Sequence, residues 1–444
     1  MFVKRIFVLT LTGISALLAL LALPALAGLD VQQWRTANGA RVYFVANHDL
    51  PMLDVSASFE AGTARDTAAT AGLSGMTHAL MRLGAGGLSE QQVAERLADV
   101  GAVMAQSQDA DRASFSVRTL SGARERSAAL AVLQAVLSRP HFDPAILSRE
   151  KARAIAGLRE AEIQPEFIAE RAFAARVFGT HPYGLHERVE TLAGLEAAQL
   201  VAFHRQFYRA AHLTLVMMGD MDRPTAEAIA QQLTQDLPTG PAAAPLPPVA
   251  ARDRAETVVL PHHATQSHLL MGLPGMTRDD PDYFPLLVGN YILGGGGFDS
   301  RLMHEIRDQR GFSYSVHSYF LPLRQRGAFE IGLQTRREAT DEAVAVVRAT
   351  VQRFIDEGPT EVELKQAQSN LTGSFPLRLD SNKKIVEYLA MLGFYGLPLT
   401  WLDDYPRRVA AVTLEDIRRA FRARVVPEQM VTVVVGGQGA RGGK

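Results

Sequence analysis

One short segment of this sequence combines several residue types that can perform chemistry. The run HEIRD at residues 304–308 departs from the zinc-binding pattern H-E-x-x-H in its last residue. Asp308 could replace the second histidine, because zinc also accepts carboxylate oxygens. The sequence offers no third ligand nearby, and this argues against a metal site at His304.

Arg307 lies within the same segment, and Tyr314 follows it seven residues later. A planar guanidinium can bind a carbonyl oxygen or an oxyanion through two N–H donors, and a phenol beside it can donate a further hydrogen bond. The spacing alone favours a plainer interpretation. In that interpretation Arg307 forms a surface ion pair and Tyr314 packs on a strand.

Other candidate groups have plainer explanations. His262, His263 and His268 lie on a strand pattern and its approach, where exposed histidines on a strand edge are expected. The glycines at 294–297 are not followed by Lys-Ser/Thr, so they predict a turn after a helix rather than a nucleotide loop. Neither half of the sequence contains a G-x-S-x-G pattern or a Ser-His-Asp arrangement.

The elements that must position these residues occur twice along the chain. Residues 56–66 and 269–279 are both apolar runs that end in G-x-x-R-D. Each half also closes with an amphipathic helix, a strand and a glycine, which is Gly219 in the first half and Gly436 in the second. The separation of these two glycines is nearly the same as that of the two apolar runs. Two nearly constant separations indicate an internal duplication.

The pattern within each half predicts an α+β fold of two homologous domains, each a mostly antiparallel sheet with helices packed on one face. Strand patterns at both ends of a half flank long helical patterns, such as 123–137 and 340–355. We expect domains at 28–236 and 257–444. Residues 237–256 predict an extended, semi-rigid linker, because their first part, 237–248, contains five prolines among small residues.

Composition and the N-terminus restrict the possible functions and locations. The absence of cysteine excludes disulfides, thiolate zinc sites and a cysteine nucleophile, and a net charge of -1 gives no sign of nucleic-acid binding. Residues 1–27 predict a signal peptide, with a basic start, an apolar run and an A-x-A site before Gly28. We therefore expect a protein exported to the periplasm or cell envelope, without a stable membrane span after cleavage. An uncleaved membrane anchor is the alternative.

Nearly all of residues 30–440 resembles the insulinase-like (M16) metallopeptidases, in particular the short bacterial kind of two repeated domains that assembles from two subunits. The segments that carry the resemblance are AGTARD (61–66), GLSGMTHALM (72–81), FGTHPYG (178–184), HEIRDQRGFSYSV (304–316), GSFPLRLDSN (373–382), YGLPLTWLDDYP (395–406) and AVTLEDIRRAF (411–421).

The resemblance implies a zinc site that this sequence has lost. Active members carry H-x-x-E-H on the first helix, with two histidine ligands and a glutamate that activates the metal-bound water. Gly75, His78 and Ala79 stand at the first histidine, the glutamate and the second histidine. The later helix, which should supply a third ligand, has Ala and Gly at its centre, and Glu150 and Glu160 are expected to be solvated helix charges. We expect no zinc bound by this chain, and residual metal at His78 or His304 stays an open alternative.

The resemblance also gives Arg307 and Tyr314 a role, because family members use such a pair to hold the substrate backbone opposite the zinc. The leading hypothesis is a non-zinc subunit of a heteromeric peptidase, inactive alone. A zinc-motif M16 paralogue would supply the metal, and this chain would supply catalytic and substrate-binding Arg307 and Tyr314 for peptide hydrolysis. The alternative is a catalytically silent scaffold or peptide-binding protein, in which the edge strand at 102–107 pairs with extended peptide.

Overall fold

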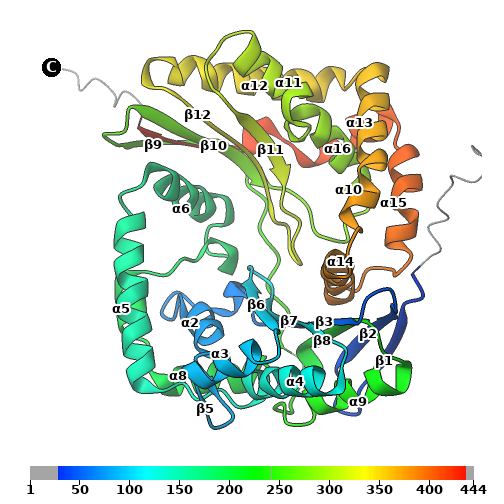
Figure 1. Ribbon diagram of the computed structural model, residues 1–444. Coiled ribbons are helices and arrows are strands. Elements are labelled where there is room, and N and C mark those ends of the chain that lie inside the picture. The colour runs from blue at the N-terminus through cyan, green and yellow to red at the C-terminus, as the bar shows by residue number, and fades with distance from the viewer. Residues whose placement is uncertain (1–28, 242, 437–444) are drawn as a thin grey trace, which may run out of the picture.

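Two α+β halves lie one above the other in the computed structural model, which describes residues 29–241 and 243–436 (Figure 1). The predicted signal peptide at residues 1–27 lies outside the described residues. In the part of the chain that is described, no helix is long and apolar enough to cross a membrane.

The first half forms a sheet with the strand order β1-β2-β8-β3-β7-β6 across the described residues. Neighbouring strands are antiparallel except β2 and β8, which are parallel. β6 alternates between exposed and half-buried residues, as expected of an edge strand. The strands are β1 (Gln32–Arg35), β2 (Arg41–Ala46), β3 (Met52–Phe59), β6 (Val103–Gln108), β7 (Ala113–Leu120) and β8 (Leu213–Gly219), with a small hairpin of β4 (Gly84–Ala85) and β5 (Leu88–Ser89). The helices are α2 (Leu73–Leu80), α3 (Glu90–Ala98), α4 (Ala123–Ser138), α5 (Pro144–Ala161), α6 (Pro165–Phe178), α7 (Val189–Ala193), α8 (Ala197–Phe207) and α9 (Arg223–Thr234).

The second half forms a sheet with the order β11-β12-β10-β13-β9, in which β13 and β9 are the parallel pair. Its strands are β9 (Glu256–Pro261), β10 (Gln266–Pro274), β11 (Val316–Phe320), β12 (Ala328–Arg336) and β13 (Val431–Gly436). Its helices are α10 (Tyr283–Asn290), α11 (Arg301–Met303), α12 (Thr340–Glu357), α13 (Glu361–Gly373), α14 (Asn382–Tyr395), α15 (Trp401–Ala410) and α16 (Leu414–Arg424). Two π-helical turns, Tyr291–Gly295 and His304–Asp308, directly follow α10 and α11.

The two sheets share one topology, because β2-β8-β3-β7-β6 corresponds strand for strand to β9-β13-β10-β12-β11. Helices α4, α5, α6 and α8 precede α12, α13, α14 and α16 by one constant separation, which equals that between Gly219 and Gly436. Gly62 and Gly275 are also equivalent, since each donates its backbone N–H to the carbonyl of a residue just before the neighbouring strand. The predicted α+β fold of two homologous domains is confirmed.

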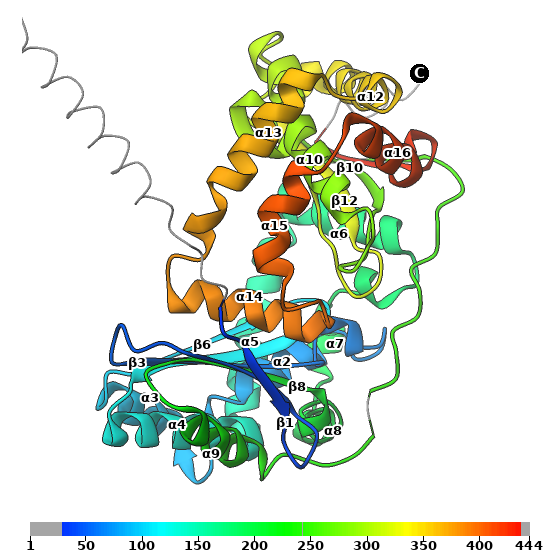
Figure 2. The ribbon, with the colours of Figure 1, turned by 90° about the vertical axis from the view of Figure 1, so that its right-hand side faces the viewer.

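Each half sends one helix across the sheet of the other, as Figures 1 and 2 show: α6 packs on β10 and β13, and α14 packs on β3 and β8. Glycines permit these close approaches. A Cβ on Gly272 would lie 2.8 Å from the Phe173 ring, and a Cβ on Gly393 would lie 2.4 Å from the Tyr43 ring. The second face of each sheet is therefore covered by the other half, which local periodicity does not indicate.

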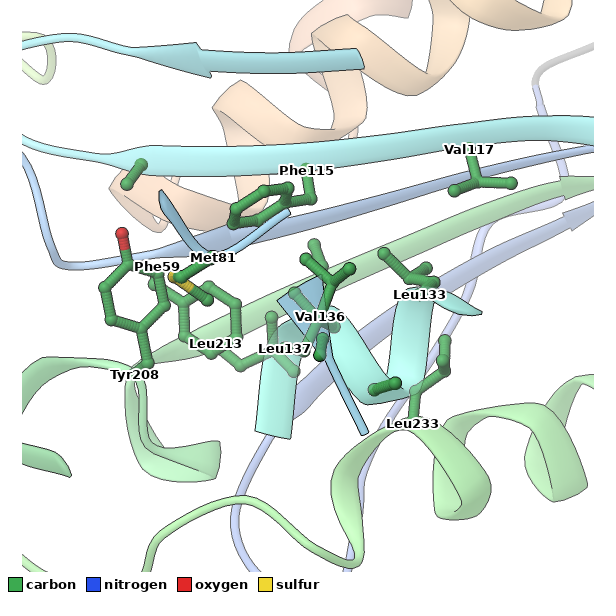
Figure 3. Packing of buried hydrophobic residues seen from close by; sticks show 14 of the residues in the cluster. Phe59, Met81, Phe115, Val117, Leu133, Val136, Leu137, Tyr208, Leu213 and Leu233 are labelled. Atoms are coloured by element: carbon green, nitrogen blue, oxygen red, sulfur yellow. The ribbon is translucent and has the colours of Figure 1, made fainter. Parts of the chain in front are cut away.

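The core of the first half holds α2 against its sheet. Figure 3 shows Phe59, Phe115 and Leu213 of the strands facing Leu133 and Val136 of α4, and all five are fully buried. Met76 and Leu80 of α2 belong to the same apolar cluster. Burial of this kind, worth about 25 cal/mol per Å² of apolar surface, fixes the position of the helix that carries the degenerate motif.

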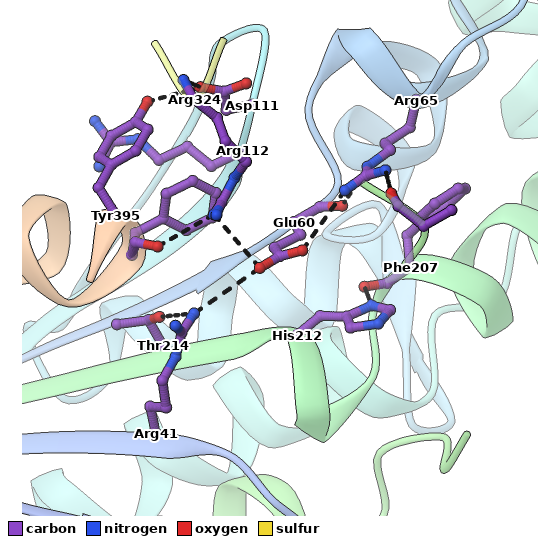
Figure 4. Close-up of polar contacts among 12 residues, drawn as sticks. Arg41, Glu60, Arg65, Asp111, Arg112, Phe207, His212, Thr214, Arg324 and Tyr395 are labelled. Atoms are coloured by element: carbon purple, nitrogen blue, oxygen red, sulfur yellow. Dashed lines mark hydrogen bonds and ion pairs between the residues drawn. The ribbon is translucent and has the colours of Figure 1, made fainter. Parts of the chain in front are cut away.

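A buried carboxylate joins the two halves. Asp111, before β7, accepts hydrogen bonds from the Tyr183 hydroxyl at 2.6 Å, the Tyr395 hydroxyl at 2.9 Å and the Arg324 backbone N–H at 2.7 Å. The Arg324 guanidinium also lies 3.4 Å from Glu60 of the first half (Figure 4). Because Tyr395 and Arg324 belong to the second half, this network fixes the relative position of the domains.

The proline-rich linker is more than a spacer. The described residues between 237 and 255 form neither helix nor strand, and the segment runs along the outside of the molecule in Figure 2 until β9 begins at Glu256. Leu246 and Val249 are nevertheless buried, and the Pro247 carbonyl lies 2.9 Å from His181 Nε2. Leu246 and Val249 therefore belong to a small apolar cluster to which both halves contribute.

Candidate functional site

The helix that should carry the zinc motif is α2, and a buried carboxylate holds its N-terminus. Asp66 accepts hydrogen bonds from the backbone N–H groups of Gly72 at 2.9 Å and Ser74 at 2.8 Å, and from the Ser74 hydroxyl at 3.0 Å. Burial raises the pKa of Asp66 to about 6. This cap aligns α2 so that Gly75 and Ala79 face a cavity.

The cavity beside α2 has a volume of about 610 Å³. Small or apolar residues of α5, including Ala154, Gly157 and Leu158, line its opposite wall. Glu150 lies at the cavity but is paired with Arg149 at 2.7 Å and Arg153 at 3.3 Å. Space remains where ligands would stand, since a Cβ on Gly75 would meet the Gln108 side chain no closer than 3.5 Å.

The residues present do not fit a zinc site. Among the described residues, no group of three or more His, Cys, Asp or Glu side chains is arranged to hold a metal ion. Glu160 is exposed and is not part of the cavity lining, in keeping with a solvated helix charge. His186 also lines the cavity, with a pKa lowered by burial and an Nε2 that has no partner within the described chain. A single histidine supplies only one ligand, fewer than a protein zinc site requires.

His78, at the position of the family's glutamate, belongs to the core. Its side chain is 4% exposed, its ring centroid lies 4.5 Å from that of Phe115, and Nδ1 lies 3.3 Å from the Tyr208 hydroxyl. Burial lowers the pKa of His78 from 6.5 to about 4, so the ring is neutral near pH 7. Because the ring is turned into the core and is not part of the cavity lining, His78 cannot take the glutamate's place as a base there.

His304 lies at the surface of the second half. Its Nδ1 is 3.9 Å from an Asp308 carboxylate oxygen, and its Nε2 is 3.0 Å from Gln309 Nε2. The carboxylate of Glu305 is instead engaged by Arg310 at 2.6 Å and Arg353 at 3.3 Å. The near match to H-E-x-x-H therefore forms ion pairs rather than a converging set of ligands.

The structure brings Arg307 and Tyr314 together. The guanidinium carbon of Arg307 lies 5.5 Å from the centre of the Tyr314 ring, and that tyrosine is 83% exposed. Gly311, with φ of 60°, makes the turn between them. Phe298 is a neighbour that the sequence did not suggest, with its ring centre 4.7 Å from the same guanidinium.

The glycine cluster seats the loop that carries Phe298. A Cβ on Gly294 would lie 2.4 Å from the Ser318 hydroxyl of β11, and Gly297 has φ of 65°. Both close packing and positive φ are therefore required here. The expectation that His268 lies on a strand edge is wrong, because β10 lies between β12 and β13.

Tyr314 also lines a second cavity, of about 360 Å³, between α6 and the second sheet. Glu166 and Glu170 of α6 and Glu330 of β12 contribute carboxylates to this cavity. Burial, together with repulsion from the other two, raises the pKa of Glu170. These residues cannot be recognised as neighbours from the sequence, because the crossing of α6 onto the other half creates the cavity. Their visible signal was the one-turn spacing of Glu166 and Glu170 on α6.

Comparisons with known proteins agree with this geometry. Residues 194–371 match the family described as the peptidase M16 inactive domain. An uncharacterized zinc protease of Streptomyces coelicolor is 27% identical, over 62% of this chain and 61% of that protein, so the match leaves over a third of it uncovered. The non-peptidase homolog YmxG of Helicobacter pylori is 26% identical, over 69% of this chain and 71% of that protein.

Solved structures extend the match to nearly the whole chain. The periplasmic protease PqqL of Escherichia coli shares the fold, with a TM-score of 0.79 and 17% identity over 92% of this chain and 45% of that one. A peptidase M16 inactive domain from Pseudomonas fluorescens has a TM-score of 0.89 and 36% identity, over 93% of this chain and 99% of that one. With this identity over both chains and a degenerate motif on α2, the protein belongs to the peptidase M16 family, where it is similar to members described as inactive.

Proposed function

We propose that this protein is the non-zinc subunit of a two-protein M16 peptidase in the cell envelope. A paralogue with an intact H-x-x-E-H motif supplies the metal and the base. This chain supplies Arg307 and Tyr314, which hold the peptide backbone and stabilise the charge that develops on the scissile carbonyl. The substrate class is unfolded or short peptide.

The observation that carries this proposal is the exposed Arg307–Tyr314 pair on a chain whose own α2 lacks ligands. The Arg307 guanidinium makes no side-chain hydrogen bond among the described residues, and its nearest carboxylate, on Asp308, is 3.7 Å away. Neither Arg307 nor Tyr314 is among the described residues that line the α2 cavity. The Arg307–Tyr314 pair thus has N–H donors available and lies apart from the degenerate site on α2 of the same chain. This arrangement suits an active site that another subunit completes.

Export and the need for a partner are part of the same proposal. The signal pattern at residues 1–27 directs the chain out of the cytoplasm. The structurally similar PqqL is a periplasmic protease, which is consistent with that location. Purified alone, the chain should neither hold stoichiometric zinc nor cleave peptide. One tightly bound zinc per chain, lost in His78→Ala, would contradict this.

The test mixes the chain with its zinc-motif paralogue and measures complex formation and peptide turnover separately. Arg307→Ala should assemble normally and lower turnover by roughly a hundred- to a thousandfold, the usual effect of removing one oxyanion donor. Arg307→Lys should restore part of the activity, because an ammonium group lacks the planar fork.

Arg310→Ala is the matched control for this experiment. Arg310 lies three residues from Arg307, but its guanidinium is already paired with Glu305 at 2.6 Å. We expect turnover within about twofold of the unmutated complex, as for most surface substitutions. Normal turnover by an assembled Arg307→Ala complex would refute the catalytic role.

A second candidate function, a catalytically silent peptide-binding protein, is favoured by the α2 cavity and the strand beside it. Gln108, at the end of edge strand β6, lines the cavity, and Val103 at the start of that strand is 63% exposed. An extended peptide could pair with β6 and place a side chain in the cavity. Micromolar binding of an extended peptide to the chain alone, weakened by Gly75→Phe, would support this function.

A further inference from the structure

Phe298 is an exposed aromatic residue beside the proposed catalytic arginine. It follows the glycine cluster in a short 3₁₀ turn, Gly297–Asp299, and is 64% exposed. An isolated exposed apolar side chain needs no explanation. Here, however, the ring centre lies 4.7 Å from the guanidinium carbon of Arg307, within the range of a cation–π contact.

Two aromatic rings therefore border one guanidinium, since Tyr314 lies 5.5 Å from the same carbon. Cation–π contacts engage the face of an aromatic ring and leave the N–H donors of the guanidinium available. A hydrogen bond would instead occupy those donors, and the ion pair of Arg307 with Asp308, at 3.7 Å, is too long to be one. The contacts at Arg307 thus restrict the side chain and keep its donors free for a ligand.

The loop that carries Phe298 is fixed to the sheet. Gly294 packs so tightly on β11 that a Cβ would lie 2.4 Å from the Ser318 hydroxyl. A buried hydrogen bond of 2.9 Å from the Asn290 side-chain amide to the Ser318 carbonyl ties the preceding helix to the same strand. The residues just before Phe298 are therefore anchored to the sheet of the same half that carries Arg307.

We propose that Phe298 is a positioning residue for Arg307, which confines the guanidinium so that its donors meet a peptide carbonyl. The functional part of this assignment rests on the proposed function above. Without this restraint, a long and flexible arginine side chain loses conformational entropy when substrate binds. A side chain that is already ordered avoids this cost, which improves binding of the transition state.

The first experiment uses the isolated chain and requires no partner. The probe is the Arg307 Nε–Hε signal in the NMR spectrum of arginine-labelled protein, assigned by its loss in Arg307→Lys. The ring current of Phe298 should displace this signal from the position of a free arginine. Phe298→Leu should move the signal toward that position, and Phe298→Tyr should restore it.

Leu377→Ala is the control, because Leu377 is a similarly exposed apolar residue, 67% exposed, elsewhere in the second half. It should leave the Arg307 signal unchanged. A signal that is the same in Phe298→Leu and the unmutated chain would overturn the assignment, since the ring would then not confine the guanidinium.

The second experiment measures turnover by the complex with the zinc-motif paralogue. Phe298→Leu should lower kcat/KM by about tenfold, less than Arg307→Ala, and Phe298→Tyr should recover it. Adding Phe298→Leu to Arg307→Ala should cause no further loss, because the ring acts through the arginine. If Arg307→Ala itself has no effect, the proposed function fails. If Arg307→Ala is impaired and Phe298→Leu is not, the positioning role alone is overturned.

Discussion

The neutral, buried state of His78 leads to a specific dependence of stability on pH. The pKa of His78 falls from 6.5 to about 4 on folding, because burial disfavours the charged ring. The unfolded chain therefore binds a proton first as the pH falls. The stabilising contribution is complete above pH 6.5, declines from there, and is fully lost below about pH 4.

The size of the effect follows from that difference of about 2.5 in pKa. A pKa difference of 1 corresponds to about 1.36 kcal/mol, so the full loss of unfolding free energy is roughly 3.4 kcal/mol. At pH 5 the unfolded ring is almost fully protonated and the folded ring is not. His78 should therefore cost the unmutated protein about 2 kcal/mol of unfolding free energy between pH 7.5 and pH 5.

His78→Asn removes the titrating ring and keeps an acceptor near the Tyr208 hydroxyl. Urea unfolding at pH 7.5 and pH 5 should show that the variant loses about 2 kcal/mol less than the unmutated chain. Tyr208→Phe is the control, because it deletes the hydrogen bond but leaves the buried ring. It should lower stability at both pH values and retain the steeper decline in acid. Parallel pH curves for His78→Asn and the unmutated chain would refute a neutral His78 in the core.

Two further predictions concern the contacts that hold the halves together. Asp111→Ala leaves the hydroxyls of Tyr183 and Tyr395 without their acceptor and should cost about 3–5 kcal/mol, with separate unfolding of the two halves visible in urea; one unshifted transition would contradict this. Gly393→Ala should destabilise by about 1–3 kcal/mol, because its Cβ would lie 2.4 Å from a ring of β2, whereas Gly157→Ala on open α5 should stabilise by roughly 0.5–1 kcal/mol. Equal thermal midpoints for the two alanine variants would show that α14 does not pack as closely as described.

Local sequence patterns were sufficient for the duplicated architecture. The starts of α4 and α12 are as far apart along the chain as Gly219 and Gly436, and so are the starts of α6 and α14. Helix and strand periodicity depend on neighbours within a few residues, so a repeated pattern folds into a repeated unit.

The two site predictions from the sequence depend on different features of the chain. Substitutions at Gly75 and Ala79 are visible in the sequence itself, and the cavity beside α2 has no converging ligands among the described residues. The proximity of Arg307 and Tyr314 could be expected because Gly311 can reverse the chain between them. The catalytic role of this pair stays a prediction, because proximity alone does not identify a partner or a substrate.

The sequence by itself determined the two-domain α+β fold, the degenerate motif on α2 and the turn that joins Arg307 to Tyr314. These features depend on residue type and on spacing along the chain. Tertiary structure alone decided that α6 and α14 cross to the opposite sheets, that His78 is neutral in the core, and that Phe298 reaches Arg307. Each of these depends on side-chain packing or burial, which the spacing of residues along the chain does not encode.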